Sequence, residues 1–78
     1  MKNFNRISTT AERLKIAMNL RGKKQVDLVR ETGIDKGALS SYLKGSYEPK
    51  QKSIYKLAKA LNVNEMWLWG YDTEMEIS

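Results

Sequence analysis

Apolar residues recur at helical spacing in several short segments of the chain, and no segment shows the sustained alternation expected of a strand. The clearest stripe has the spacing i, i+3, i+4, i+7 and consists of Ile54, Leu57, Ala58 and Leu61. An earlier stripe consists of Leu14, Ala17 and Met18, with Ile16 and Leu20 beside it. The pattern predicts an all-α protein.

Residues that begin and end helices divide this pattern into a compact bundle of about five helices. Thr9 and Glu12 have the Thr-x-x-Glu spacing of a capping box, in which each side chain bonds the other residue's backbone amide. Asp35 and Asn64 are favourable N-caps. Glycines follow the first three helices, where left-handed geometry often ends a helix. The predicted helices cover residues 10–21, 25–32, 36–44, 51–61 and 65–69.

Each short helix also predicts a buried face. Val26 and Val29 share one face of the second helix, and Leu28 flanks it. In the third helix, the inward residues are expected to be Leu39, Tyr42 and Leu43. Trp67 is expected in the core, whereas Trp69 fits either the core or a partner interface. The segment from residue 71 to residue 78 has three acids and no periodicity, so we expect it to be loosely held.

Charge is distributed unevenly along the 78 residues, which have room for one domain. Residues 1–52 contain 12 Lys and Arg and 5 Asp and Glu, a net charge of +7. Residues 53–78 contain 2 Lys and 4 Asp and Glu, a net charge of −2. A one-sided basic excess suits a polyanion such as nucleic acid or an anionic membrane surface. Charge alone leaves open a solvated surface without a partner.

The composition argues against several functional classes. The chain has no cysteine and no histidine, so we expect no metal, no cofactor and no enzymatic activity. Asp27, Glu31 and Asp35 could lie close together, but helix-surface and capping roles explain them better. No apolar run approaches the roughly 20 residues that span a bilayer, and the N-terminus lacks a signal-peptide core. A cytoplasmic location is therefore expected.

Residues 25–45 have the plan of a helix-turn-helix. Gly33 permits a sharp reversal between two short helices because it has no Cβ, and Ile34 can fill the angle between them. If the apolar residues of the second of these helices turn inward, its outer face is small and polar or basic. Such a face fits a DNA major groove about 12 Å wide.

The ordered motifs resemble the Cro/phage-repressor helix-turn-helix family, also called the xenobiotic-response-element (lambda-repressor-like) family. The matching segments are Gln25-Val26-Asp27-Leu28-Val29, Gly33-Ile34, residues 38–45 (ALSSYLKG), Pro49, residues 57–63 (LAKALNV) and residues 67–71 (WLWGY). The resemblance implies an N-terminal arm at 1–8, a DNA-binding domain at 9–71 with its helix-turn-helix at 25–44, and an acidic tail at 72–78.

Several residues are assigned to DNA on this basis. Lys36 can donate to guanine near the start of the recognition helix, Gly37 allows close approach, and Ser40 and Ser41 can bond base edges or phosphates. Family members with Gln at the position of Gln25 use it on a phosphate. A backbone-contact role is implied for Lys44, Ser46, Tyr47, Lys50 and Lys52, with Lys23 and Lys24 flanking the site. The alternative for each of these is an ordinary solvated surface.

The sequence departs from the family pattern at two places. Many members pair an Arg with a Glu at the positions of Met18 and Leu43. Because matched apolar residues often replace a buried ion pair without loss of stability, we expect Met18 to contact Leu43. Lys24 stands where a Ser or Thr usually caps the second helix, which is therefore expected to begin less firmly.

The resemblance implies a sequence-specific transcriptional regulator, of the phage or prophage repressor type, that binds a palindromic operator in double-stranded DNA as a homodimer. The isolated chain is also compatible with a monomer. An alternative on the same fold is an antitoxin-like or adaptor module, whose interaction site would centre on Trp67, Trp69 and Tyr71.

Overall fold

The helices form in the segments that the sequence predicts. A computed structural model describes residues 5–77, and its helices are α1 (Thr10–Arg21), α2 (Gln25–Thr32), α3 (Lys36–Lys44), α4 (Gln51–Leu61) and α5 (Glu65–Trp69). Residues 1–4 of the predicted arm lie outside the described part. Within residues 5–77 the extended pairing is limited to one antiparallel bridge between Arg6 and Tyr71. The all-α prediction is confirmed.

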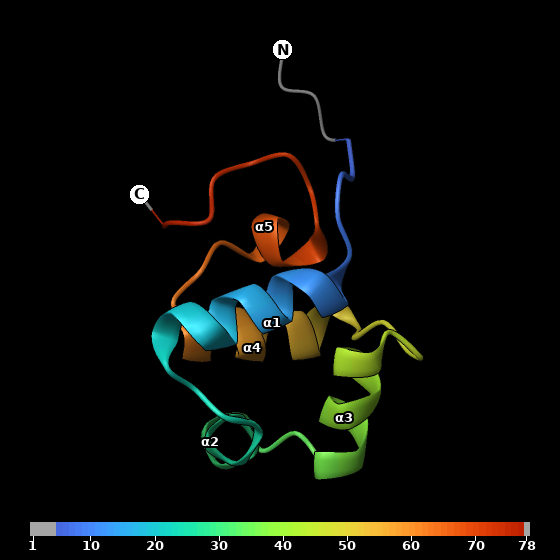
Figure 1. Cartoon of the computed structure of the whole chain (residues 1–78), viewed down its shortest axis with the longest axis vertical. Coiled ribbons are helices and arrows are strands. Elements are labelled where there is room, and N and C mark those ends of the chain that lie inside the picture. Colours follow the sequence, from blue (N-terminus) through green and yellow to red (C-terminus); the bar gives the residue numbers. More distant parts are fainter. Residues whose placement is uncertain (1–4, 78) are drawn as a thin grey trace.

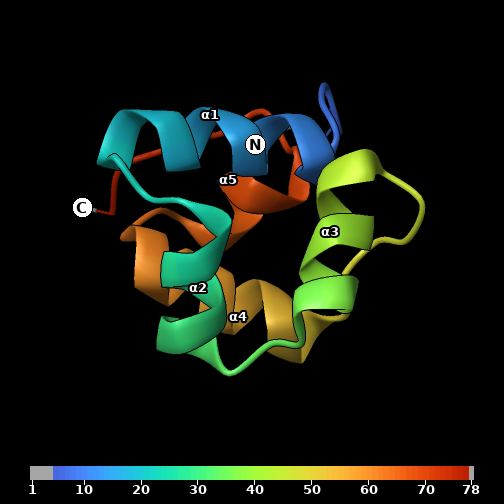
Figure 2. The same cartoon turned by 60° about the horizontal axis from the view of Figure 1, so that its bottom comes forward.

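Helix α1 lies at the centre of the bundle and packs against α3, α4 and α5 (Figure 1). Helices α2 and α3 lie on one side of α1, whereas α5 and the C-terminal segment lie on the other. Helix α4 runs behind α1 and contacts α2 and α5. The two helices of the predicted helix-turn-helix therefore lie side by side at one end of the molecule, with α2 packed on α4 and α3 packed on α1 (Figure 2).

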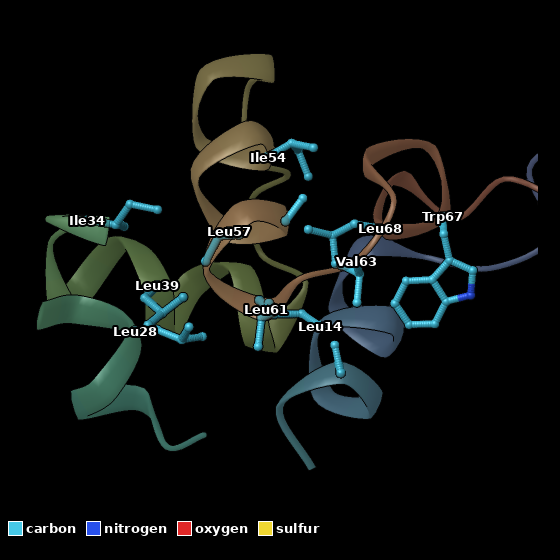
Figure 3. Close-up of a cluster of buried hydrophobic side chains, with 12 residues drawn as sticks. Leu14, Leu28, Ile34, Leu39, Ile54, Leu57, Leu61, Val63, Trp67 and Leu68 are labelled. Carbon is cyan, nitrogen blue, oxygen red and sulfur yellow. The ribbon is translucent and has the colours of Figure 1, made fainter. Parts of the chain in front are cut away.

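The core is built mainly from the predicted stripes (Figure 3). Leu14 and Ala17 of α1 and the whole stripe of α4 are buried, and Trp67 is buried as expected. Leu39 is fully buried, and Tyr42 and Leu43 are half-buried against the same cluster. Complete burial of a leucine side chain contributes about 1.5–3 kcal/mol. The inward anchoring of α3 is thus confirmed.

The predicted buried face of α2 is wrong at Val26. Leu28 is fully buried, Val29 is half-buried, and Val26 is 62% exposed. In eight residues, three apolar side chains do not define a unique face, and the positions of α3 and α4 select the face that includes Leu28. On α1, Ile16 and Leu20 also face solvent, although they lie beside the buried stripe.

The helix ends follow the predicted capping chemistry. The capping box is present, with the Thr9 hydroxyl accepting from the amide of Glu12 and the Glu12 carboxylate accepting from the amide of Thr9. Helix α2 has no cap from the Lys24 side chain, as expected. The Asp27 carboxylate nevertheless accepts from the Lys24 amide at 2.8 Å, so one half of a capping box holds the start of α2.

A buried arginine in α1 is not anticipated by the sequence pattern. Arg13 is 8% exposed, and its guanidinium carbon lies 4.7 Å from the centre of the Trp67 ring. Its Nη1 donates to the backbone oxygen of Trp67 at 3.1 Å. A ring face and a carbonyl oxygen both attract a cation, so they offset part of the desolvation of the guanidinium. Arg13 thereby links α1 to α5.

The C-terminal segment is held against the domain, contrary to expectation. The backbone amide of Asn64 donates to the oxygen of Met75 at 2.8 Å, and the Met75 side chain packs against the core. Arg21 pairs with Glu76 at 3.2 Å and also donates to the oxygens of Leu61 and Asn62 at the end of α4. The segment makes these contacts without any regular helix or strand, and a periodicity argument cannot detect them.

The predicted contact between Met18 and Leu43 remains a prediction. Both side chains are half-buried and pack against the same core cluster, and α1 packs directly against α3. Both positions are thus compatible with apolar residues in place of the charged pair that many family members have.

Candidate nucleic-acid interface

The turn between α2 and α3 has the geometry expected of a helix-turn-helix. Gly33 ends α2 with a φ of 74°, a left-handed conformation that favours glycine. Ile34, 8% exposed, is buried in the core, as the sequence predicts. Asp35 caps α3, because its Oδ2 accepts from the amides of Gly37 at 2.9 Å and Ala38 at 3.3 Å. Local residues thus set where α3 begins.

The outer face of α3 is open and has no large apolar side chain. Lys36, Gly37 and Lys44 are exposed, and Ser40 and Ser41 are half-buried on the same helix. Within residues 5–77 no ion pair involves either lysine. The face therefore offers two cationic groups and two hydroxyls on a narrow helix, which are suitable donors for phosphates and base edges.

The absence of a side chain at Gly37 also leaves room for the residue that caps α3. A Cβ at this position would lie 3.0 Å from Oδ2 of Asp35, the oxygen that caps α3. The sequence suggested that Gly37 permits close approach to DNA. The structure adds that its missing side chain leaves room for the capping carboxylate, which is independent of any ligand.

The loop between α3 and α4 meets the outer face of α3. A shallow hollow is lined by Gly37 and Ser41 of α3, by Tyr47 and Lys50 of the loop, and by Ser53 of α4. Tyr47 is 71% exposed, and Ser46, Lys50 and Lys52 are also exposed. The fold therefore brings four of the predicted DNA-contact residues around one hollow.

The remaining predicted residues lie around this centre. Lys44 and Tyr47 line a second hollow together with Arg6 and Lys15, beside the N-terminal end of α1. Gln25 is half-buried at the first position of α2. A helix N-terminus has free amides and a partial positive charge, so this position suits a phosphate.

The acids near the helix-turn-helix have structural partners. Glu31 pairs with Lys23 at 2.7 Å, so Lys23 is not a free flanking cation. Asp27 accepts from the Lys24 amide and from Arg30 at 2.9 Å, and these bonds, the amide first, lower the pKa of its carboxyl. Asp35 caps α3. Asp27, Glu31 and Asp35, the acidic residues that a catalytic role would require, therefore each have a partner that stabilises local structure.

Sequence reasoning did not identify Arg6 as part of this surface. Its guanidinium forms an ion pair with Glu48 in the loop that also contains Tyr47. The hydrogen bond from Arg6 lowers the pKa of the Glu48 carboxyl, which is therefore negatively charged at neutral pH. No sequence signal connects two charged residues 42 positions apart in a single chain.

The alternative interaction site does not assemble as a single exposed patch. Trp67 is in the core beneath Arg13, Tyr71 is half-buried and paired with Arg6 through the backbone bridge, and Trp69 is half-buried. Trp69 instead lines an apolar hollow between α4, α5 and the C-terminal segment.

A capped α3, a basic outer face and a helix-turn-helix turn are typical of a DNA-binding domain. The family described as Helix-turn-helix matches residues 14–68 of the chain. The protein therefore belongs to the helix-turn-helix family, in its xenobiotic-response-element, lambda-repressor-like branch, and is a DNA-binding transcriptional regulator of that type. No individual curated protein matches the chain.

Residues 5–77 offer neither a membrane span nor a metal site of acidic residues. None of the helices there has the length and apolar character required to cross a membrane. The carboxylates in the same range do not gather into a group of three that could hold a metal ion.

Proposed function

We propose that the protein is a repressor of the phage or prophage type that binds a palindromic operator as a homodimer, with α3 in the major groove. The observation that supports this most directly is the exposed face of α3, which begins with Lys36 and Gly37 and has Leu39 as its buried anchor. A rigid anchor and a slender polar face are what groove insertion requires.

The contacts fall into two groups in this proposal. Lys36 donates to guanine O6 or N7 from the first turn of α3, and Ser40 and Ser41 bond neighbouring base edges or phosphates. Phosphates on either side are held by the N-terminal end of α2 at Gln25 and by a second set, consisting of Lys44, Ser46, Tyr47, Lys50 and Lys52. The first group supplies specificity, and the second supplies affinity and register.

The apolar hollow beside α5 is a suitable surface for the second subunit. Tyr55, Met66 and Ile77 are 51%, 37% and 60% exposed and line it together with Trp69. Lys59 and Glu65 line the same hollow with opposite charges. In a two-fold interface the same patch meets itself, so the lysine of one subunit can face the glutamate of the other.

Selection of bound duplexes from a random pool, followed by footprinting, tests the proposal. We expect enrichment of a symmetric site whose half-sites are about 34 Å apart. The logarithm of the affinity should fall with the logarithm of salt concentration, with a slope of about −0.9 for each phosphate contact. A salt-independent affinity would contradict the proposal. If no duplex is enriched and the apolar hollow captures a different protein, the adaptor alternative is favoured.

A charge placed in the hollow tests the homodimer separately. We expect Met66→Glu to weaken cooperative occupation of the full operator by at least tenfold, because a carboxylate would be desolvated on both sides of the interface. Binding to a duplex with one half-site should stay within about twofold of the unaltered protein, since Met66 lies outside the α3 surface. Lys56→Gln, which lowers the net charge by the same single unit on α4 at a residue that does not line the hollow, is the control. Unchanged cooperativity in Met66→Glu would place the subunit contact elsewhere.

A further inference from the structure

We propose that Arg6 is a positioning residue of the DNA-contact surface, which acts by holding and neutralising Glu48. Residues 45–50, the contact loop, contain Ser46, Tyr47 and Lys50. The inference rests on the proposed function, because it assigns a role in DNA binding to a residue outside the helix-turn-helix. Arg6 itself need not touch DNA in this role.

Each of the three guanidinium nitrogens of Arg6 has a hydrogen-bond partner, and the partners come from two distant segments. Nη1 donates to Oε2 of Glu48 at 3.1 Å, and Nη2 bonds Oε1 of the same carboxylate. Nε donates to the backbone oxygen of Trp69 at 3.0 Å, near the end of α5. A bidentate ion pair of this kind restricts the orientation of the guanidinium and the carboxylate more than a single contact from a lysine would.

The backbone around Arg6 is anchored, so the side chain reaches the contact loop from a fixed point. The amides of Ile7 and Ser8 both donate to the oxygen of Gly70, at 2.8 and 3.0 Å. The amide of Asp72 donates to the oxygen of Asn5 at 3.0 Å. Figure 1 shows that the chain just before α1, residues 5–8, lies beside the segment that follows α5, on the side of the molecule where the contact loop lies. Arg6 therefore links the loop to α5.

Electrostatics gives the link a role in binding a polyanion. Glu48 is the only acidic residue of the contact loop, and its neighbours are assigned to phosphates. An uncompensated carboxylate at that position would repel the DNA backbone, whereas the Arg6–Glu48 pair is neutral. The two side chains are 37% and 54% exposed, so the pair acts mainly on the loop and on nearby charges rather than on global stability.

The pair also limits the freedom of Tyr47. Tyr47 precedes Glu48 and is 71% exposed, with both residues lining the hollow that includes Gly37 and Ser41. Pro49, which is buried, holds the other side of Glu48. Fixing Glu48 from both sides orders the loop before DNA arrives, which reduces the entropy lost on binding.

A double-mutant cycle on the selected operator tests this role. We expect Arg6→Ala to bind about tenfold more weakly, because the loop loses its tether and acquires an unpaired carboxylate. Glu48→Gln should stay within about threefold of the unaltered protein, because it loosens the tether but leaves Arg6 positive. The double variant should recover to within about threefold, because the carboxylate is gone.

Arg21→Ala is the matched control. Arg21 lies at the other end of α1, and like Arg6 it pairs with a glutamate and donates to backbone oxygens. The substitution removes the same charge and a similar set of bonds, and it should change operator affinity by less than about threefold when measured well below the unfolding temperature.

Several outcomes would overturn the inference. These are unaltered binding by Arg6→Ala, equal weakening by Arg6→Ala and Glu48→Gln with no recovery in the double variant, or an equal loss in Arg21→Ala. NMR titration of the Glu48 carboxyl gives a readout without DNA. Its pKa should rise towards the ordinary glutamate value in Arg6→Ala, and an unchanged pKa would show that the pair is not formed. If the unaltered protein enriches no duplex, the proposed function itself fails.

Discussion

Replacing Lys36 with alanine is expected to lower affinity for the selected operator about 5- to 150-fold and to relax base preference at one position of each half-site. The range corresponds to the 1–3 kcal/mol of discrimination that a good contact to guanine supplies. Lys36 is exposed at the first position of α3 and has no ion-pair partner within residues 5–77, so the fold should be unaffected. Repeating the duplex selection with the variant measures both quantities.

Lys44→Ala is the control for this prediction, because it removes the same charge from the opposite end of the same helix. A phosphate contact weakens specific and non-specific binding alike and reduces the salt slope by about 0.9. We therefore expect Lys44→Ala to preserve base preference and Lys36→Ala to lose it. If both variants lose affinity equally for operator and unrelated DNA, Lys36 contacts the backbone and the assigned readout is wrong.

Replacing Gly70 with alanine is expected to destabilise the protein by roughly 3 kcal/mol, the sum of a left-handed backbone penalty and a steric clash. Gly70 has a φ of 102°, and a Cβ there would lie 2.3 Å from the backbone oxygen of Ser8 and 2.8 Å from its carbonyl carbon. Because both atoms belong to the backbone, the arm must move away from α5. Thermal or urea unfolding measures the loss, which should lower the melting temperature by more than 10 °C.

Gly22→Ala separates the two contributions. Gly22 also has a positive φ, of 66°, but a Cβ there meets no atom within 4 Å. Its replacement should cost only about 1 kcal/mol, from backbone strain alone. Equal losses in the two variants would mean that the arm is not docked on α5. Because Arg6 lies in this arm, Gly70→Ala should also weaken the Arg6–Glu48 pair.

The helices and their ends could be predicted because the interactions that define them are local. The capping box of Thr9 and Glu12 and the cap at Asp35 involve residues within three positions of each other. The α4 stripe of Ile54, Leu57, Ala58 and Leu61 is long enough to define a single buried face. Gly33 and Ile34 likewise indicate the turn of the helix-turn-helix from adjacent residues.

The candidate site was predictable only in part. The outer face of α3 could be predicted because Leu39 is buried. The helical repeat then places the residues on the opposite side of α3 toward solvent. The hollow lined by Gly37, Ser41 and Tyr47 depends on the path of the contact loop. A loop has no hydrophobic periodicity from which its path could be predicted. Arg6 lies at this surface only because the segment before α1 packs on the end of α5, which is distant from it in the sequence.

By itself, the sequence determined where the helices begin and end, which face of α4 is buried, and that α2 and α3 form a helix-turn-helix. Only the tertiary structure decided that Leu28 rather than Val26 enters the core, that Arg13 is buried over Trp67, and that Arg6 reaches Glu48. The physical reason is the range of the interactions. Caps and stripes act within one or two turns of a helix, whereas the others join segments that become neighbours only when the chain folds.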